Sequence, residues 1–164
     1  MDGRNLFEGD IAPDSIAGSF MAGVLAHSRE LTVFTNPLPN SYQRFGCDEA
    51  PRYVSWSRQN RSQLVRIPQV KGNNCRMELR SPDPACNPYL AVGLVLAAGL
   101  DGIEHRMVLQ APINKNLFDP TEPQVLGWKD CLPRWRRPCR PRRRANFCTA
   151  CCRKSFRIGT MRKN

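Results

Sequence analysis

RMELRSPDPACNPYL, residues 76–90, contains the signals of a strand, an extended turn and the start of a helix. Its first five residues alternate between charged and apolar side chains, as a strand does when only one of its faces packs. The two prolines that follow keep the chain extended, because the residue before a proline is pushed away from the helical region. Asn87 then suits an N-cap and Pro88 the first helical turn, and the apolar run behind them predicts a buried helix to Gly99 or Gly102.

The rest of the pattern predicts one more long helix and two more strands. Asp14 or Ser15 can cap an apolar pattern with i, i+4 spacing that runs to about residue 29. Residues 36–42 contain two prolines and two asparagines, which favour an irregular loop. Residues rich in β-branched and aromatic side chains predict strands at 52–56, 62–67 and 76–80. The expected fold class is α/β (α+β), with antiparallel strands and packed helices.

The positive charge is concentrated at one end of the chain. The 164 residues carry a formal net charge of +11 and 41% hydrophobic residues. Residues 134–164 hold 12 Lys or Arg and no Asp or Glu, whereas the remaining 133 residues hold 13 basic and 14 acidic side chains. Four of the eight cysteines also lie in this last segment. We therefore expect a folded unit over 1–133 and a disordered basic tail over 134–164.

The sequence predicts a cytoplasmic location. Residues 1–10 are polar and resemble no secretory leader, so the thiols are expected to stay reduced. The longest apolar run, residues 89–100, is too short to cross a bilayer. We therefore expect a soluble protein with no membrane partner.

Arginine is abundant around the expected strand at 76–80. On that strand Arg76, Glu78 and Arg80 would share one face, which a solvated sheet surface would also show. The preceding sequence adds further arginines, among them Arg44, Arg58, Arg61 and Arg66. The planar guanidinium binds phosphate or carboxylate through two parallel hydrogen bonds, and a carboxylate among arginines suits Mg²⁺ bridging phosphate oxygens. These residues predict an anionic, phosphorylated ligand.

Several motifs, in one order, resemble those of bacterial type I glutamine synthetase. They are NSYQR at 40–44, EAP at 49–51, NRS at 60–62, RIP at 66–68, RSPDP at 80–84 and NPYL at 87–90. The resemblance runs from about Asn5 to about Pro133 and corresponds to the later part of the family's catalytic domain. It implies the ligation of ammonia to glutamate by ATP through γ-glutamyl phosphate, with Mg²⁺ or Mn²⁺, in a homo-oligomer.

The resemblance implies roles for four residues that would contact glutamate, ammonia and metal. Glu78 resembles the divalent-metal ligand of its strand. Arg80 and Arg44 resemble arginines that hold glutamate. Glu49 resembles the catalytic flap glutamate that closes the site and helps to deprotonate ammonium.

Three arginines resemble residues around the nucleotide. Arg61 and Arg66 correspond to arginines that contact the ATP phosphates, and Arg61 also has a catalytic role in stabilising the transferring charge. Arg76 would lie beside the nucleotide. Arg61 and Arg66 are an odd number of positions apart, so a regular strand would point their side chains to opposite faces. It could not direct both at one ligand without a bulge or a loop.

Other parts of the family's site would precede Met1, including further glutamate ligands and a metal-binding histidine. Neither His27 nor His105 is expected to replace them. The isolated chain is therefore expected to be an incomplete enzyme, and one further possibility is a non-catalytic partner that enters intact synthetase rings.

The basic tail has alternative interpretations. Cys139 and the Cys148-x-x-Cys151-Cys152 cluster could form a zinc site, and the five arginines of residues 137–144 could bind nucleic acid. A frameshift after Pro133 explains more, because a shift by one base turns Cys and Trp codons into Leu, Met or Val codons. The shifted tail then shows the spacing of an amphipathic helix. On this interpretation no specific nucleic acid is a partner.

Overall fold

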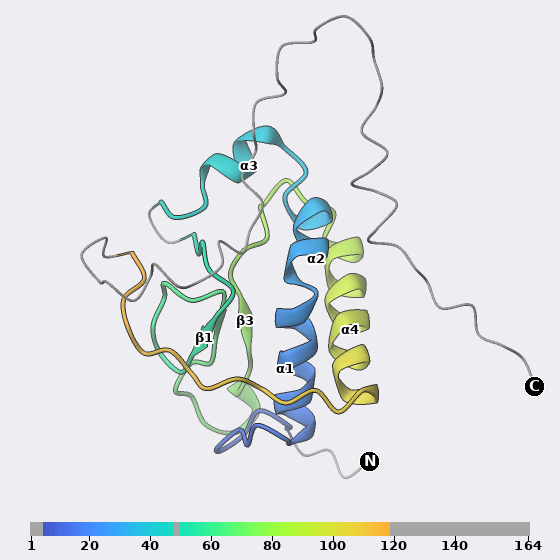
Figure 1. Cartoon of the computed structure of the whole chain (residues 1–164), viewed down its shortest axis with the longest axis vertical. Helices are drawn as coiled ribbons and strands as arrows, with labels where there is room; N and C mark the ends of the chain where they lie inside the picture. The colour runs from blue at the N-terminus through green and yellow to red at the C-terminus, as the bar shows by residue number, and fades with distance from the viewer. Residues whose placement is uncertain (1–4, 48–49, 119–164) are drawn as a thin grey trace, which may run out of the picture.

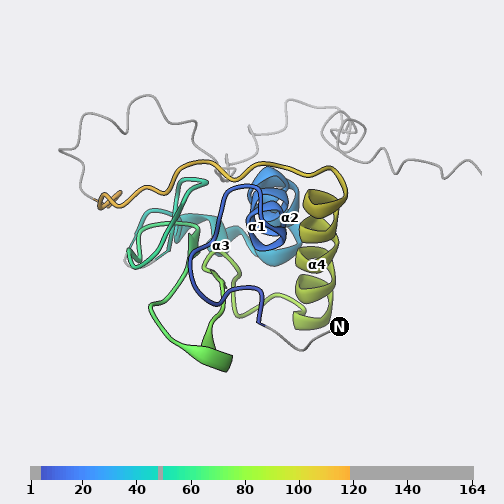
Figure 2. The same cartoon turned by 90° about the horizontal axis from the view of Figure 1, so that it is seen from below.

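The computed structural model describes residues 5–47 and 50–118, and Figure 1 shows their helices beside a small sheet. The predicted tail over 134–164, with its cysteines and arginines, lies outside the described residues. In chain order the helices and strands are α1 (Ile16–Ala26), α2 (Ser28–Thr35), α3 (Pro39–Gln43), β1 (Trp56–Ser57), β2 (Val65–Arg66), the 3₁₀ turn Gly72–Asn74, β3 (Glu78–Leu79) and α4 (Pro88–Glu104). Seen from below, α1 lies between the sheet and α4 (Figure 2). This mixture of helices and a small sheet confirms the expected α+β class.

The sheet is smaller than expected and only partly antiparallel. Its order is β1-β2-β3, and β2 and β3 are antiparallel with Arg66 opposite Glu78. The prediction of antiparallel strands was wrong for β1 and β2, which are parallel with Trp56 opposite Val65. The intervening loop returns the chain in its original direction, and the Val65 amide donates to the Ser55 carbonyl at 3.0 Å.

The first helical region is divided into two helices. Ser15 is the N-cap of α1, and its hydroxyl accepts the Gly18 amide at 3.0 Å. The single helix predicted to about residue 29 ends at Ala26, and α2 begins at Ser28, whose hydroxyl donates to the Leu25 carbonyl at 2.8 Å. Such a side-chain bond competes with the backbone ladder of a helix, which accounts for the break.

The proline-rich segments behave differently from each other. Residues 36–42 were predicted to be a loop, but α3 begins within them, because Pro39 occupies the first helical turn and the Ser41 hydroxyl accepts the Leu38 amide. The helix predicted at Asn87 is confirmed as α4. The Asn87 side chain accepts the amides of Tyr89 and Leu90 at 3.0 and 3.3 Å.

The α1 and α4 helices cross at unusually close range, through glycines. A Cβ atom added to Gly23 would lie 2.7 Å from the Gly102 Cα and would overlap the Ala98 carbonyl oxygen. A Cβ added to Gly99 would enter the ring of Phe20. The backbones touch directly, so any side chain at these glycines would separate the helices.

The hydrophobic core lies between α1 and the sheet. It contains the fully buried Met21 of α1 and Leu64 and Val65 near β2, with Trp56 of β1 4% exposed. The segment after α4 closes this core, because Leu109 is buried in it and its amide donates to the Pro13 carbonyl at 3.0 Å.

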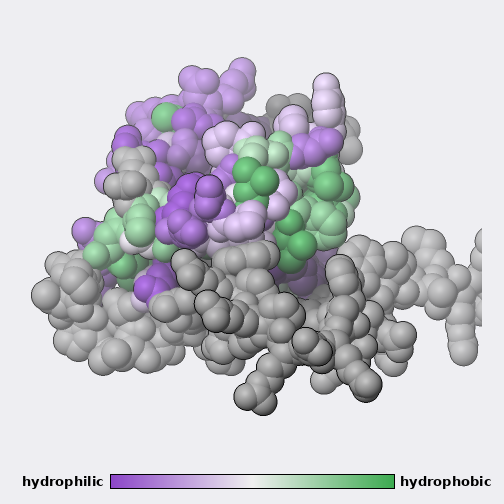
Figure 3. Space-filling view, turned by 90° about the horizontal axis from the view of Figure 1, so that it is seen from above, coloured by the Kyte–Doolittle hydropathy of each residue, from purple (hydrophilic) through white to green (hydrophobic). Residues whose placement is uncertain are grey.

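One face of α4 is covered by α1 and the other carries exposed apolar side chains. Tyr89, Val92, Leu96 and Leu100 are 51% to 89% exposed. Figure 3 shows hydrophobic side chains gathered on the side of the molecule where α4 lies. In this chain α4 is therefore covered on one side and exposes apolar side chains on the other. Within residues 5–47 and 50–118 no helix meets the length and hydropathy needed to cross a membrane.

The glycine crossing predicts a large stability cost for a single methyl group. Gly23→Ala or Gly102→Ala should lower the free energy of unfolding by about 2–4 kcal/mol, because the backbones have no room to relax. Gly93→Ala is the matched control, since nothing lies within 4 Å of its Cβ position, and it should be neutral or stabilise by up to about 1 kcal/mol. Urea unfolding of the three variants tests this, and equal stabilities would contradict the close crossing.

A second prediction concerns the junction of α1 and α2. His27 Nε2 lies 2.9 Å from Asp101 Oδ2 of α4 and His27 Nδ1 lies 3.0 Å from Glu30 Oε2. The hydrogen bond to Asp101, followed by that to Glu30, raises the pKa of His27. Stability from a raised histidine pKa is fully present below the unfolded value of about 6.5 and is lost as the pH rises through the folded value.

His27→Gln should therefore lower the free energy of unfolding by about 0.5–1 kcal/mol near pH 5.5 and by less near pH 9. This is the size expected for an ion pair such as His27–Asp101, whose side chains are about one-third exposed. Urea unfolding at both pH values measures this difference. Asp101→Asn should remove most of the pH dependence as well. A constant difference between the wild-type chain and His27→Gln across this range would show that the ion pair does not contribute.

Candidate functional site

Glu78 of β3 is the centre of a charged cluster. Its Oε2 accepts from Arg66 Nη1 at 2.9 Å, and its Oε1 accepts from Arg76 Nη2 at 2.8 Å. The side chains of Arg66 and Glu78 are 23% and 27% exposed, and that of Arg76 is 53% exposed. Burial raises the pKa of Glu78, but the hydrogen bonds from Arg66 and Arg76 outweigh burial and hold the pKa below its ordinary value. The carboxylate is therefore ionised at neutral pH, between two guanidinium groups.

The register of the sheet creates this cluster. Arg66 on β2 lies directly opposite Glu78 on β3, so their side chains emerge on the same face. The Arg66 Nε also donates to the Gln59 carbonyl at 3.0 Å, which connects the cluster to the loop between β1 and β2. Sequence reasoning missed Gln59, because the contact involves a backbone carbonyl and leaves no pattern of residue types.

Arg61 lies in that loop and not on a strand. The strand predicted over 62–67 is limited to Val65–Arg66, and Arg61 is exposed in the turn before it. Side chains alternate between the two faces of a sheet only within a strand. Because Arg61 lies in a turn, the expectation that its side chain and that of Arg66 point to opposite faces does not apply.

Arg44, at the end of α3, contacts the proline turn after β3. Its Nη2 donates to the Ser81 carbonyl at 2.6 Å and to Asn36 Oδ1 at 3.1 Å, and its Nε lies 3.6 Å from Asp83 Oδ2. The Ala85 amide donates to Asp83 and lowers the pKa of that carboxyl, with a further contribution from Arg44. Because Ser81 follows Arg80 directly, the structure brings Arg44 next to the Arg80 backbone.

The remaining predicted site residues have different positions. The backbone amide of Arg80 donates to the Leu64 carbonyl at 2.9 Å, and the guanidinium Nη1 of Arg80 is buried. Glu49, the predicted flap glutamate, lies outside the described residues. Arg58, which was counted among the nearby arginines, pairs with Asp10 at 2.8 Å and is not part of the Glu78 cluster.

The described residues do not make a metal site by themselves. Among residues 5–47 and 50–118 no three His, Cys, Asp or Glu side chains are grouped so that they could hold a metal ion. Both oxygens of Glu78 are bonded to arginines, and His27 and His105 are both bonded to Asp101. Both histidines are therefore held at Asp101 of α4. One carboxylate falls short of the six oxygen ligands of Mg²⁺.

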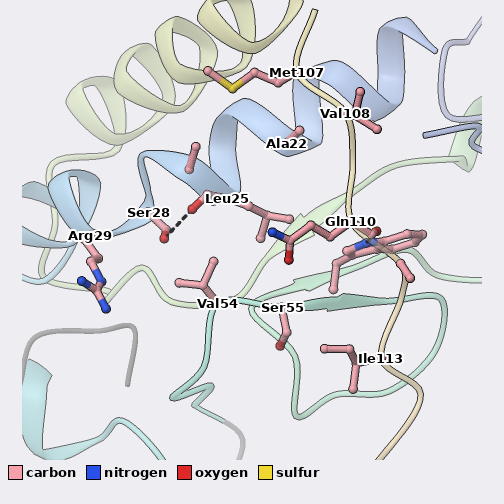
Figure 4. Close-up of a pocket in the computed structure, with 13 residues that line it drawn as sticks. Ala22, Leu25, Ser28, Arg29, Val54, Ser55, Met107, Val108, Gln110 and Ile113 are labelled. Carbon is pink, nitrogen blue, oxygen red and sulfur yellow. Dashed lines mark hydrogen bonds between the residues drawn. The ribbon is translucent and has the colours of Figure 1, made fainter. Parts of the chain in front are cut away.

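A cleft of about 630 Å³ lies elsewhere, between the α1–α2 junction and β1 (Figure 4). Its lining is largely apolar and includes Leu25, Val54 and Met107, with Arg29 beside them. None of the predicted anion-binding arginines lines this cleft. The cleft and the charged cluster are therefore separate features, and the cluster is the candidate site.

A sequence profile described as "Glutamine synthetase, catalytic domain" matches residues 1–136. The chain belongs to this family. It is 50% identical over 121 residues to the glutamine synthetase of Methanosarcina mazei, 45% identical over 122 residues to that of Pyrococcus furiosus and 44% identical over 126 residues to that of Staphylococcus epidermidis. These matches cover 71–75% of this chain and 27–28% of the relatives. The chain therefore spans only about a quarter of the length of these relatives.

A solved structure titled "GmaS/ADP complex-Conformation 1" shares the fold, with a TM-score of 0.67 and 36% sequence identity. The match covers 80% of this chain and 31% of that one. The relatives include archaeal and bacterial synthetases, so the comparisons establish the glutamine synthetase catalytic domain without restricting it to the bacterial type I group.

The Glu78 cluster predicts that Glu78 competes with anions for its two arginines. Glu78→Gln should strengthen binding of metal-free tripolyphosphate by about two- to fivefold, since a partly exposed ion pair is worth up to about 1 kcal/mol. Calorimetric titration at low salt measures this affinity. Glu104→Gln, the same charge change at the end of α4, is the control, and an equal gain in both variants would mean that only net charge matters.

Proposed function

We propose that this chain supplies one side of the ATP and glutamate site of a glutamine synthetase, the ligase that joins ammonia to glutamate through γ-glutamyl phosphate. The observation that carries this proposal is the pairing of Glu78 with Arg66 and Arg76, close to the turn where Arg44 meets Ser81. Family membership supports it, because the NSYQR, RIP and RSPDP motifs carry Arg44, Arg66 and Ser81, and Arg76 and Glu78 lie just before RSPDP.

Of the three arginines proposed to bind the nucleotide, Arg61 and Arg66 are assigned to the phosphates and Arg76 lies beside them. Arg66 and Arg76 converge on Glu78, and Arg66 also bonds the loop that carries Arg61. Phosphoryl transfer requires little covalent chemistry from a protein, so fixed positive charges near the γ-phosphate are the main contribution that these arginines can make. Arg61 is exposed and is proposed as the catalytic arginine that stabilises the transferring charge.

The glutamate-binding role is assigned to Arg44 and Arg80. The Arg44 contact with the Ser81 carbonyl brings these two arginines to the same turn, where their charges suit the carboxylates of glutamate. Glu49 is proposed as the general base that accepts a proton from ammonium, on the strength of the EAP motif alone.

Glu78 is proposed as this chain's ligand to Mg²⁺ or Mn²⁺. The described residues do not complete such a site, so the other ligands would have to come from a further part of a synthetase polypeptide or from another subunit of a homo-oligomer. A bound metal would neutralise phosphate charge. Arg66 or Arg76 would then have to exchange its bond to Glu78 for one to phosphate, which the exposed position of Arg76 permits. We place this assembly in the cytoplasm.

Binding of ATP with Mg²⁺ to the full chain tests the phosphate assignment. Arg66→Ala should weaken it about tenfold, the equivalent of about 1.4 kcal/mol for one charge-assisted hydrogen bond. Arg58→Ala is the matched control, because Arg58 pairs with Asp10 outside the cluster. Calorimetry or fluorescent-nucleotide titration measures both variants, and equal affinities would contradict the proposed site.

The same preparation should form no glutamine from ATP, glutamate and ammonium. Positioning and electrostatics supply nearly all of the catalysis, and the described residues offer only one carboxylate for the metal. Measurable glutamine formation by the chain alone would show that the site is complete.

For the carboxyl-terminal segment we propose a frameshift after Pro133 in a gene for a bacterial type I enzyme. The composition changes at this point, and the family match ends at residue 136. A zinc-binding or nucleic-acid-binding module is the alternative. Resequencing of codons 130–140 tests the frameshift, while stoichiometric zinc bound by thiolates, or sequence-specific nucleic-acid binding at physiological salt, would favour the alternative.

A further inference from the structure

Residues 109–117, which we call the strap, run from the end of α4 across the core to the sheet (Figure 1). The indole Nε1 of Trp56 donates to the Gln110 carbonyl at 2.7 Å, and the Ile113 amide donates to the Trp56 carbonyl at 2.8 Å. The strap is therefore bound to β1 by two hydrogen bonds, one donated by Trp56 and one donated by the strap. Beyond these bonds it reaches the loop that carries Arg61.

Beyond β1 the strap is held by side chains of that loop. The Lys115 carbonyl accepts from Asn60 Nδ2 at 2.7 Å and from Gln63 Nε2 at 2.9 Å. The Leu117 amide donates to the Ser62 hydroxyl at 2.9 Å. Three residues of the NRSQ sequence thus bind the strap, and the fourth is Arg61.

The geometry of these bonds is closely determined. Gln63 is fully buried, and its Oε1 accepts from the Ser55 hydroxyl while its Nε2 donates to the strap. Leaving a buried amide without these partners is costly, so Gln63 fixes the distance between Ser55 and Lys115. Asn60 uses both ends of its amide as well, since its Oδ1 accepts from the Ser62 amide at 2.9 Å.

Arg61 is the exposed residue in the middle of this arrangement. The backbone of Asn60, the residue before Arg61, makes two bonds to the Ser57 hydroxyl. The Asn60 carbonyl accepts from this hydroxyl at 3.1 Å, and the Asn60 amide donates to it at 2.9 Å. The Arg66 guanidinium holds the Gln59 carbonyl on the other side of the loop. The backbone is therefore held before Arg61, at Gln59 and Asn60, and after it, at Ser62, which limits the positions that the Arg61 side chain can take.

We propose that Asn60 and Gln63 are positioning residues, which use the strap to aim Arg61 at the phosphates. This inference rests on the proposed function, because it assigns the strap a role in the same anion site. A guanidinium at the end of a long flexible side chain loses less freedom on binding when its backbone is already fixed.

Asn60→Ser separates the two tasks of Asn60. A serine hydroxyl can still accept the amide two residues later, as Asn60 does, but it is too short to reach the Lys115 carbonyl. Asn116→Ser is the matched control on the strap itself, since Asn116 Oδ1 accepts the Phe118 amide in the same way. Neither substitution changes the net charge, so neither alters long-range attraction for anions.

The affinity of the full chain for ATP with Mg²⁺ is measured for both variants, with and without Arg61→Ala. We expect Asn60→Ser to weaken binding about fivefold in the wild-type background and less than about twofold when Arg61 is already alanine, because coupled residues are not additive. Asn116→Ser should have no effect in either background. Equal losses for Asn60→Ser in both backgrounds, or no loss at all, would overturn the proposal.

Amide hydrogen exchange distinguishes failure of this inference from failure of the proposed function. Asn60→Ser should speed exchange at Leu117 and Ile113 more than Asn116→Ser does, if Asn60 holds the strap. Faster exchange in a chain that does not bind ATP would overturn the proposed function and the aiming of Arg61 with it. ATP binding that depends on Arg61, together with unchanged exchange and affinity in Asn60→Ser, would overturn the role of the strap alone.

Discussion

The contact between the backbones of α1 and α4 is the constraint on which the rest of the fold depends. Gly23 and Gly102 meet without any intervening side chain, and this places α4 against one side of α1. The opposite side of α1 is then left for the core formed with Trp56, Leu64 and Val65. The position of α4 also bears on the candidate site, because α4 follows the proline turn after β3 and leads into residues 109–117, which bind the loop that carries Arg61.

The candidate site depends on electrostatic balance more than on a cavity. A carboxylate between two arginines satisfies the charges of both while no anion is bound, which limits the cost of gathering cations near one another. Each arginine that bound an anion instead would leave one oxygen of Glu78 without its partner, so the charge of Glu78 opposes anion binding at this cluster. The cleft beside β1 is lined mainly by apolar side chains and has no such carboxylate between arginines.

Much of this arrangement could be predicted from the sequence, and the failures have physical causes. The caps at Ser15 and Asn87 and the shared face of Arg76 and Glu78 follow from local rules, and the structure has them. The parallel pairing of β1 and β2 could not be predicted, because it depends on the path of the intervening loop and not on residue type. The contacts of Arg44 with Ser81, and of Gln63 with Lys115, involve carbonyls far away in the sequence and leave no local pattern.

The exposed apolar face of α4 has a consequence for the life of the chain in a cell. Tyr89, Val92, Leu96 and Leu100 form the kind of surface that chaperones bind and that leads to aggregation or proteolysis when it stays uncovered. The steady-state amount of the chain then depends on how quickly another surface covers this helix after synthesis. Abundance in the cell would therefore be set by assembly as much as by the stability of the fold.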